Sequence, residues 1–388
     1  MKKIVILGGS HRDIPLIKAS QELGYYVITL GDRDYYLGHN YSNKACKINF
    51  NDLDKVKELI KEEEVDYIIP GSGEESYLNT VLLAHELHIG NFDTLETAQL
   101  VHNKWKFKKF CLENGISTPK GFFYNENSND KINLEFPIVV KPTNLSGGRG
   151  VEVVYNENQL HKALQHTSDI SNEIFLEEFI DGKLIAYSIF LKEQKIVYGF
   201  LGDDATYLNP YLITSAYPTT IEKETLTKLQ NDIEKLAQLL KLVDGMFHLQ
   251  VLIKNNIPYI IDVTRRIPGD LYPYLIEYSD GVEYSKAVVK AYTTGQIDDE
   301  FKYKNEKQNF IIRHCVMPTQ NGIYESIKID SSLEEKILLN FSLIEPEYHI
   351  TNYLNTQLAI IFIKLDKSDE IENIIKNINK LIQVTLKK

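Results

Sequence analysis

Short apolar runs alternate with amphipathic stretches over the first quarter of the chain. The runs at 3–8, 26–31 and 65–71 are continuous, rich in β-forming residues and end in glycine, as strands buried on both faces do. Between them, 15–24 and 52–64 carry apolar residues at helical spacing. This alternation of strand and helix predicts a doubly wound parallel sheet, in which ligands bind at the carboxyl ends of the strands.

The loop after the first predicted strand is Gly8-Gly9-Ser10-His11. Its glycines do not have the GxGxxG spacing that places a helix N-terminus against a dinucleotide pyrophosphate. The sequence therefore favours a tight turn from strand to helix over a dinucleotide site at this position.

The pattern changes after a helical stretch at 97–115, because strands and hairpins now mix with helices. This mixture is typical of an α+β arrangement. One long amphipathic helix is predicted at 222–241 and two further helices at 270–294. Nearer the C-terminus, the pattern predicts two strands joined by a turn at Asn321-Gly322, followed by a last strand and a helix. The chain as a whole is expected to combine an α/β part with an α+β part.

Composition and charge narrow the class of protein. The 388 residues carry a formal net charge of −11 and have no dense Lys/Arg cluster, so we expect no nucleic-acid partner. Cys46, Cys111 and Cys315 lie far apart and form no CxxC pair, which suits a reducing compartment. No apolar stretch approaches the ~20 residues of a membrane span. We expect a cytoplasmic protein without a membrane partner.

A first candidate for chemistry is the segment 136–151, where a strand delivers Lys141 to a glycine-rich loop. Glycines allow the backbone to approach an anion closely, and a lysine ammonium supplies the charge that phosphates require. The segment is not a P-loop, since no GK[ST] opens a following helix. Taken alone, it is explained equally well by a structural β-turn.

Two later segments are further candidates for chemistry. The strand at 175–182 carries two carboxylates before an Asp-Gly turn, which fits either an adenine-binding strand or a solvated edge strand. The stretch at 248–270 predicts a β-hairpin that brings Gln250 and Asp262 together. A carboxylate with neutral oxygens suits Mg²⁺, and arginines that follow could neutralise a phosphoryl group. The alternative to this phosphate-binding role is a surface arginine pair that forms salt bridges with nearby acidic residues.

The order of these segments resembles the ATP-grasp superfamily, with biotin carboxylase, carbamoyl-phosphate synthetase and amino-acid ligases as look-alikes. The resemblance implies a Rossmann-like N-terminal domain at 1–95, an ATP-grasp domain at 96–300 and a small C-terminal α+β domain at 301–388. Within the ATP-grasp domain, it implies a lid subdomain at about 120–180 and a larger subdomain at about 181–300.

The resemblance also implies roles for individual residues. Those that would bind the nucleotide are Lys104, Lys141, Gly147, Gly148, Gly150, Glu177, Glu178, Phe179, Ile180 and Leu252. Those that would hold Mg²⁺, with Mn²⁺ as an alternative, are Gln250, Asp262 and Thr264. The catalytic residues would be Lys141 and Arg266, with Arg266 facing an acyl phosphate. Substrate contacts are expected from His11, Glu74, Glu75 and Arg265.

The sequence departs from the family pattern at the metal positions. Gln250 stands where the family usually has Glu, and Thr264 stands where Asn is usual. Fewer charges should weaken magnesium binding or make it depend more on the nucleotide. Leu184 occupies a position that is often acidic and holds the ribose, and Asp181, Asp203 or Asp204 remain open as substitutes.

The implied function is an ATP-dependent ligase that activates a small carboxylate, such as an amino acid, as an acyl phosphate. An amine, or a thiol, would then displace phosphate, with release of ADP. The partners would be ATP, the carboxylate and the amine acceptor, and look-alikes also suggest a homodimer. Two alternatives stay open: a regulatory ATP-binding protein that has lost the chemistry, and a carboxylase-type enzyme that activates bicarbonate.

Overall fold

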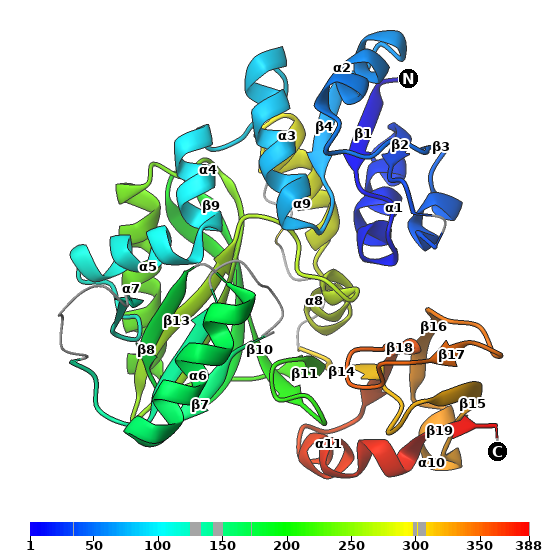
Figure 1. Ribbon diagram of the computed structural model, residues 1–388. Coiled ribbons are helices and arrows are strands. Elements are labelled where there is room, and N and C mark those ends of the chain that lie inside the picture. The colour runs from blue at the N-terminus through cyan, green and yellow to red at the C-terminus, as the bar shows by residue number, and fades with distance from the viewer. Residues whose placement is uncertain are drawn as a thin grey trace.

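The computed structural model describes residues 1–33, 35–124, 133–142, 150–171, 173–297, 301 and 308–387. Within these residues, the strands form a parallel sheet, two antiparallel sheets of four and eight strands, and a three-stranded sheet near the C-terminus. In Figure 1, the N-terminal sheet (blue) and the C-terminal segment (orange and red) lie on the same side of the central part of the chain. Gly147 and Gly148 lie outside the described residues.

The N-terminal sheet is parallel, as the sequence predicts. Its strands are β1 (Lys3–Leu7), β2 (Tyr26–Leu30), β3 (Lys44–Cys46) and β4 (Tyr67–Pro70), in the order β3-β2-β1-β4. Its helices are α1 (Ile14–Glu22), α2 (Leu53–Glu62) and α3 (Glu74–Leu87). The short strand β3 was not predicted, because its residues are exposed or half-buried and form no apolar run.

The loop after β1 makes the predicted tight turn. A Cβ atom on Gly8 would lie 2.7 Å from Oδ2 of Asp13 and 3.1 Å from the Cα atom of Gly71. The first distance is shorter than real Cβ contacts and the second is tighter than most of them, so the turn favours glycine where the loops after β1 and β4 meet.

The helical stretch predicted at 97–115 is two helices, α4 (Leu95–His102) and α5 (Lys104–Glu113). The break occurs at Asn103, whose backbone is extended (φ −99°, ψ 102°). Its side-chain oxygen accepts a hydrogen bond of 2.9 Å from the backbone N–H of Lys106. Asparagine competes with helical hydrogen bonds in this way, so it starts a new helix rather than continuing the old one.

A small antiparallel sheet with one helix forms the predicted lid region. It contains β5 (Gly121–Tyr124), β6 (Ile138–Pro142), β7 (Glu152–Val154) and β8 (Ile174–Glu178), in the order β5-β8-β6-β7. Helix α6 (Glu157–Ile170) covers one face through Leu160, Ala163 and Leu164.

The largest sheet is antiparallel and runs through the middle of the molecule. In order, its strands are β13 (Ile257–Thr264), β12 (Gly245–Lys254), β9 (Lys183–Lys192), β10 (Lys195–Thr206), β11 (Ile213–Pro218), β14 (Phe310–Val316), β18 (Ala359–Leu365) and β16 (Ile337–Ser342). The predicted hairpin is β12–β13, and the long predicted helix is α7 (Lys223–Leu239).

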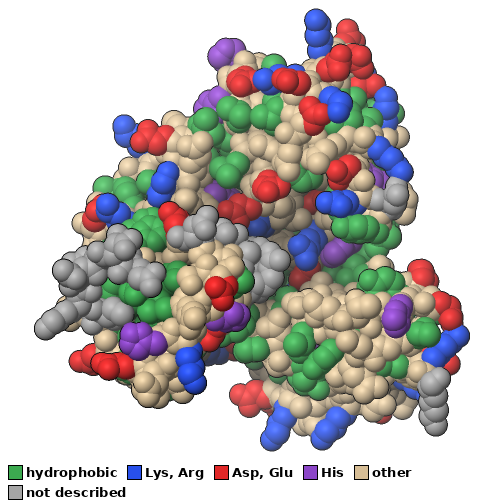
Figure 2. Space-filling view, viewed as in Figure 1, with side chains coloured by type: hydrophobic (Ala, Val, Ile, Leu, Met, Phe, Trp, Pro, Cys, Tyr) green, Lys and Arg blue, Asp and Glu red, His purple; other side chains and the backbone are tan. Residues whose placement is uncertain are grey.

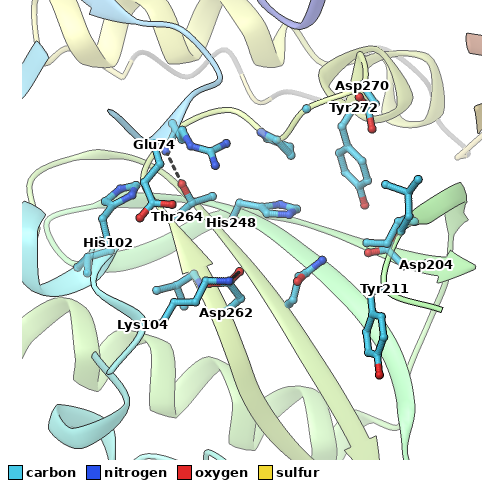
Figure 3. A pocket seen from close by; sticks show the side chains of 18 of the residues that line it. Glu74, His102, Lys104, Asp204, Tyr211, His248, Asp262, Thr264, Asp270 and Tyr272 are labelled. Atoms are coloured by element: carbon cyan, nitrogen blue, oxygen red, sulfur yellow. Dashed lines mark hydrogen bonds and ion pairs between the residues drawn. The ribbon is translucent and has the colours of Figure 1, made fainter. Parts of the chain in front are cut away.

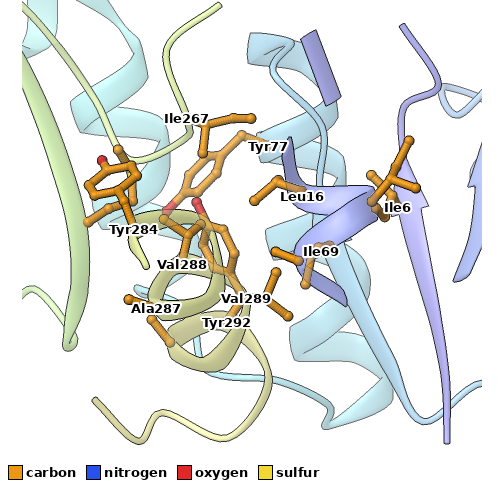
Figure 4. Close-up of a cluster of buried hydrophobic side chains, with 14 of the residues drawn as sticks. Ile6, Leu16, Ile69, Tyr77, Ile267, Tyr284, Ala287, Val288, Val289 and Tyr292 are labelled. Carbon is orange, nitrogen blue, oxygen red and sulfur yellow. The ribbon is translucent and has the colours of Figure 1, made fainter. Parts of the chain in front are cut away.

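The two faces of this large sheet have different neighbours. One face, with Ile189 and Leu249, packs against Leu229 and Ile233 of α7. The other face belongs to a core that also includes α8 (Tyr272–Asp280), α9 (Tyr284–Thr293) and the N-terminal sheet. Figure 4 shows Val288, Val289 and Tyr292 of α9 facing Tyr77, Ile69 and Leu16 of the N-terminal part.

The residues after 301 build a small α+β unit and also extend the large sheet through β14, β18 and β16. The unit contains β15 (Gly322–Ile329), β17 (His349–Ile350), β19 (Ile382–Leu386), α10 (Ser331–Glu334) and α11 (Glu370–Leu381). None of the helices in the described part of the chain combines the length and apolar character of a membrane span.

Candidate active site

A cavity of about 310 Å³ lies between α3, the start of α5, the large sheet and the loop after β13. Figure 2 shows a hollow in the middle of one face, with basic and acidic side chains in it. The residues that line the cavity are Glu74, Val101, His102, Lys104, Asp204, Tyr211, Leu212, Ile213, His248, Gln250, Asp262, Val263, Thr264, Arg266, Pro268, Gly269, Asp270, Tyr272 and Arg313. Six predicted site residues are among them: Glu74, Lys104, Gln250, Asp262, Thr264 and Arg266.

The hairpin β12–β13 presents the predicted metal residues. Gln250 lies directly opposite Asp262 in the register of the two strands. Oδ2 of Asp262 lies 3.1 Å from Nζ of Lys104, while its Oδ1 accepts a hydrogen bond of 3.1 Å from the N–H of Val263. The break before α5 brings Lys104 to this carboxylate.

The oxygen atoms of the predicted metal residues fit a magnesium ion that takes most of its ligands from water and substrate phosphates. Gln250, Asp262 and Thr264 offer amide, carboxylate and hydroxyl oxygens, which are hard ligands. No cluster of three or more His, Cys, Asp or Glu residues in the described ranges is placed to hold a metal. One carboxylate with two neutral oxygens matches the way Mg²⁺ is held by few side chains together with substrate phosphates.

Arg266 supplies a positive charge to the same cavity. Its Nε is buried and has no hydrogen-bond partner among the described residues, and its backbone N–H donates to Oγ1 of Thr264 over 3.3 Å. Burial raises the pKa of Glu74 in this cavity, although the charges of Arg266 and Lys104 oppose the shift. Nη1 of Arg266 donates to the carbonyl oxygen of Ile267 over 3.4 Å, so the unpartnered Nε is the part of this guanidinium that is available to an anionic ligand.

Two lysines share one carboxylate where the lid sheet meets α5. Nζ of Lys141 lies 2.5 Å from Oε1 of Glu177, and Lys108 contacts the same carboxylate. Burial, followed by the nearby charge of Lys104, lowers the pKa of Lys141 to about 8. Burial, followed by the charge of Lys141, also lowers the pKa of Lys108 well below its usual value. Both amines therefore lack negative charge around them, and the cluster suits an added anion.

Lys108 was not predicted from the sequence, and it is only 6% exposed. The signal was present, because Lys104 and Lys108 stand four residues apart and therefore share one face of α5. The resemblance drew attention only to Lys104, and the abundance of lysine in this helix hid the second position.

The predicted adenine segment lies at the hinge between the lid sheet and the large sheet. Strand β8 ends at Glu178, and Phe179-Ile180 continue toward β9. A Cβ on Gly182 would lie 2.7 Å from the carbonyl oxygen of Ile253, so this hinge passes close to β12. Leu252, next to Ile253, is on the same face of β12 as Gln250. Gly150, at the end of the predicted lid loop, has φ +73°.

Three predicted substrate residues lie outside the cavity lining. Arg265 is 4% exposed, and its guanidinium donates to Asp93 and to the carbonyl oxygens of Val243 and Met246. Glu75 is exposed and accepts a hydrogen bond from Asn51, whereas Glu74 points into the cavity. His11 lies 3.8 Å from Asp270.

A second group of residues lines the other side of the cavity, and of these only Asp204 was named from the sequence, as one open candidate for holding the ribose. Figure 3 shows Asp204, Tyr211, Asp270 and Tyr272 on one side of the pocket, with Lys104, Asp262 and His102 on the other. Arg313 of β14 also lines the cavity. A lone arginine within the apolar run of β14 was an available signal, since a charge in a buried strand needs a reason.

Comparisons with known proteins define the class. Residues 134–273 match the family model described as "ATP-grasp domain", so the chain contains such a domain and the resemblance is confirmed. A phosphoribosylglycinamide synthetase structure from Anaerococcus prevotii has a TM-score of 0.81 at 20% identity, covering 100% of both chains. An L-amino acid ligase structure from Bacillus licheniformis has a TM-score of 0.83 at 18% identity, covering 100% of this chain and 99% of that one. The predicted ATP-grasp fold is therefore confirmed.

Curated relatives match a smaller share of the chain, at slightly higher identity. The C-terminal section of a carbamoyl phosphate synthase large chain from Aquifex aeolicus is 25% identical over 296 residues, covering 68% of this chain and 53% of the relative. A formate-dependent phosphoribosylglycinamide formyltransferase from Sulfurisphaera tokodaii is 24% identical over 282 residues, covering 68% of this chain and 70% of the relative. The chain thus spans about half the length of the first of these two relatives.

Proposed function

We propose that this protein is an ATP-dependent ligase that activates a small carboxylate as an acyl phosphate and joins it to an amine, releasing ADP and phosphate. The observation that carries the proposal is the cavity in which Lys104 and Asp262 meet Arg266, whose buried Nε has no partner among the described residues. The match to the ATP-grasp domain model, and two structures of similar fold that are named as a synthetase and a ligase, support the same reaction class.

In this proposal, ATP binds between the lid sheet and the large sheet. Ile180 and Leu252 border the adenine, while Lys104, Lys108 and Lys141 neutralise the phosphates. Gln250, Asp262 and Thr264 hold the nucleotide's magnesium ion, which supplies charge neutralisation at the phosphates. The polyphosphate adds the negative charge that Lys108 and Lys141 lack, and Glu177 keeps the two lysines in place until the polyphosphate binds.

Arg266 performs the step that distinguishes a ligase from a nucleotide-binding protein. The carboxylate oxygen attacks the γ-phosphorus, and charge builds up on the transferred oxygens. The Arg266 guanidinium, with a free Nε, is positioned to stabilise this charge and then the acyl phosphate. No protein nucleophile is required, because positioning and charge neutralisation supply the catalysis.

The regulatory alternative has one specific observation in its favour. Gln250 offers no charge, so Asp262 is the one carboxylate of the hairpin pair facing a metal. A protein that binds ATP without turnover would be consistent with this reduced charge.

The test is ATP consumption in the presence of magnesium, measured against an array of amino acids and other small carboxylates with amine acceptors. We expect substrate-dependent release of ADP and phosphate, reduced at least 100-fold in Lys141→Ala and Asp262→Ala, since such groups contribute roughly that much to transition-state stabilisation. Lys195→Ala is the control, because Lys195 is 60% exposed and pairs with Glu234.

Other products would decide against the proposal. AMP with pyrophosphate would mean adenylation. ATP binding without turnover on any carboxylate would favour the regulatory alternative, and turnover on bicarbonate alone would favour the carboxylase-type enzyme.

A further inference from the structure

One face of the large sheet carries a row of polar side chains that extends well beyond the predicted metal residues. Gln250 pairs with Asp262 on one side and with Ala186 on the other, and Ala186 pairs with Gly202. Directly paired residues of antiparallel strands share a face, as do residues two apart on one strand. Asp204, two residues after Gly202, therefore lies on the same face as the metal pair.

The row continues to the C-terminal segment. Asp204 pairs with Ala216 of β11, and Ala216 pairs with Arg313 of β14. At a strand separation of ~4.8 Å, the Cα atoms of Asp204 and Arg313 are about 10 Å apart, with only an alanine methyl between them. The order across the sheet is metal pair, then Asp204, then Arg313.

Small residues form the floor of this part of the cavity. Ala186, Gly202 and Ala216 occupy the positions between the polar side chains. A Cβ on Gly202 would collide with the Tyr272 hydroxyl, so glycine allows this tyrosine to reach the floor. The Tyr272 hydroxyl has no hydrogen-bond partner among the described residues. The small residues leave room for a ligand, and the Tyr272 hydroxyl beside them is available for a hydrogen bond to it.

Asp204 is the buried carboxylate of the row that lacks a hydrogen-bond partner for one of its oxygens. It is 8% exposed, and its Oδ1 has no hydrogen-bond partner in the part of the chain that the structure describes. A buried carboxylate without a partner is costly, which is why such groups are normally paired. Burial raises the pKa of Asp204 to about 7, and the charge of Arg313 only partly opposes this shift. A positively charged ligand group would satisfy it.

Arg313 requires the opposite kind of ligand. Its Nη1 donates to the carbonyl oxygen of Asp270 over 3.3 Å, while its Nε is buried without a partner among the described residues. The Asp270 carboxylate is already engaged by Nε of Arg12 at 3.2 Å and by Nε2 of Gln357 at 3.1 Å. Arg313 therefore keeps an N–H group and part of its charge for an acceptor in the cavity.

We propose that the amine substrate is an amino acid, whose ammonium group binds Asp204 and whose carboxylate binds Arg313 above Ala216. The inference rests on the proposed ligase function and identifies its acceptor. The order across the sheet places the nitrogen between its own carboxylate and the metal pair, where the acyl phosphate forms. The Tyr272 hydroxyl supplies the third polar contact.

The same arrangement gives Asp204 a part in the reaction. The ammonium group passes one proton to the Asp204 carboxylate, and the freed nitrogen lone pair forms a bond to the acyl carbon. The bond between that carbon and the phosphate oxygen breaks, and phosphate leaves with its electron pair. A second proton from nitrogen goes to the departing phosphate, so the products are an amide, hydrogen phosphate and neutral Asp204.

The test is calorimetric titration of the full chain, loaded with magnesium and ADP, with individual protein amino acids. Each amino acid is compared with its α-hydroxy acid, which lacks the ammonium group, and with its methyl ester, which lacks the carboxylate. We expect at least one amino acid to bind about thirty-fold or more tightly than both analogues, as loss of a buried charge partner implies.

Asp204→Asn should remove the preference for amino acid over hydroxy acid while leaving ADP affinity unchanged. Asp203→Asn is the matched control, because Asp203 is the next residue along the strand, faces the opposite side of the sheet and pairs with Lys183. Binding of no amino acid, or an unchanged preference in Asp204→Asn, would overturn the inference. An equal loss for amino acid and hydroxy acid would also overturn it, since that indicates a structural role.

The result is separable from the ligase proposal. ADP release with a different class of amine would leave the ligase function standing and remove this inference. Amino-acid binding that depends on Asp204, without any ADP release, would keep the inference and remove the ligase function.

Discussion

Individual charges in the site are arranged for ligands that add negative charge. Glu177 is the one carboxylate that Lys108 and Lys141 share, and burial lowers the pKa of both amines. A buried charge that lacks a partner destabilises the fold, and here the missing partner is the proposed polyphosphate. Stability and nucleotide binding should therefore change in opposite directions at this cluster.

This opposition is testable with two variants. Glu177→Gln should lower the free energy of unfolding by about 3 kcal/mol, because it leaves both lysines without an anion. Lys141→Met should raise that free energy by about 1 kcal/mol while weakening ATP binding, since it leaves one lysine paired with the one carboxylate of Glu177. Urea unfolding of the ATP-free protein, with calorimetry for ATP, measures both.

Glu178→Gln serves as the control for this pair. Glu178 is the neighbouring carboxylate, half-buried, and accepts a hydrogen bond from the N–H of Lys120. A change of no more than about 1 kcal/mol is expected there. Equal destabilisation by Glu178→Gln, or a loss of stability in Lys141→Met, would contradict the charge argument.

At the residue scale, the sequence could not show which of two adjacent arginines lines the cavity. Arg265 and Arg266 are adjacent, and both were predicted to be site residues. The structure brings only Arg266 into the cavity, because Arg265 is bound by the buried carboxylate of Asp93, far away in sequence. Asp93 carries no local signal of this pairing, so the choice between the two arginines required the tertiary structure.

At the scale of elements, locally encoded features were predictable. The hairpin β12–β13 places Gln250 opposite Asp262, as their spacing predicts, because a short turn fixes the register. The parallel strands of the N-terminal sheet follow from continuous apolar runs. The break at Asn103 was missed, since asparagine is also found inside helices and the apolar pattern continues across it.

Long-range strand pairing was not predictable. The row from Asp204 to Arg313 depends on the pairing of β11 with β14, in which Ser215 meets His314. No local pattern specifies a partner about one hundred residues away. For this reason Arg313 and Tyr272, on the far side of the cavity, were missed, while the hairpin β12–β13 was predicted.

At the scale of the whole molecule, Asp270 joins three parts of the chain. Its carboxylate contacts Arg12 and His11 of the N-terminal part and Gln357 of the C-terminal segment, and Arg313 of β14 lies 4.0 Å away. Burial alone would raise the pKa of Asp270, but these partners hold it well below its usual value. The cavity lies where the three parts meet, so this junction also shapes the site.

The low pKa of Asp270 predicts how stability depends on pH. A depressed pKa contributes stability above the unfolded value of about 3.9, and this contribution is lost as pH falls through the folded value. Asp270→Asn should therefore lower the free energy of unfolding by about 3 kcal/mol at pH 7, with a smaller difference below pH 4. Urea unfolding across this pH range measures the difference.

Asparagine is a suitable replacement because the backbone at residue 270 has φ +53°, which asparagine tolerates. The exposed Asp366→Asn is the control and should change little. A destabilisation by Asp270→Asn that is equal at pH 7 and below pH 4 would show that lost packing, not charge, is responsible.

The acyl phosphate is the central claim, and oxygen transfer tests it most directly. A carboxylate that supports ADP release is labelled with ¹⁸O in both oxygens, and the phosphate released during amide formation is analysed by mass spectrometry. The account predicts one ¹⁸O atom in each phosphate, because the carboxylate oxygen that attacks the γ-phosphorus leaves with it. Phosphate without label, or label found in AMP, would contradict the account.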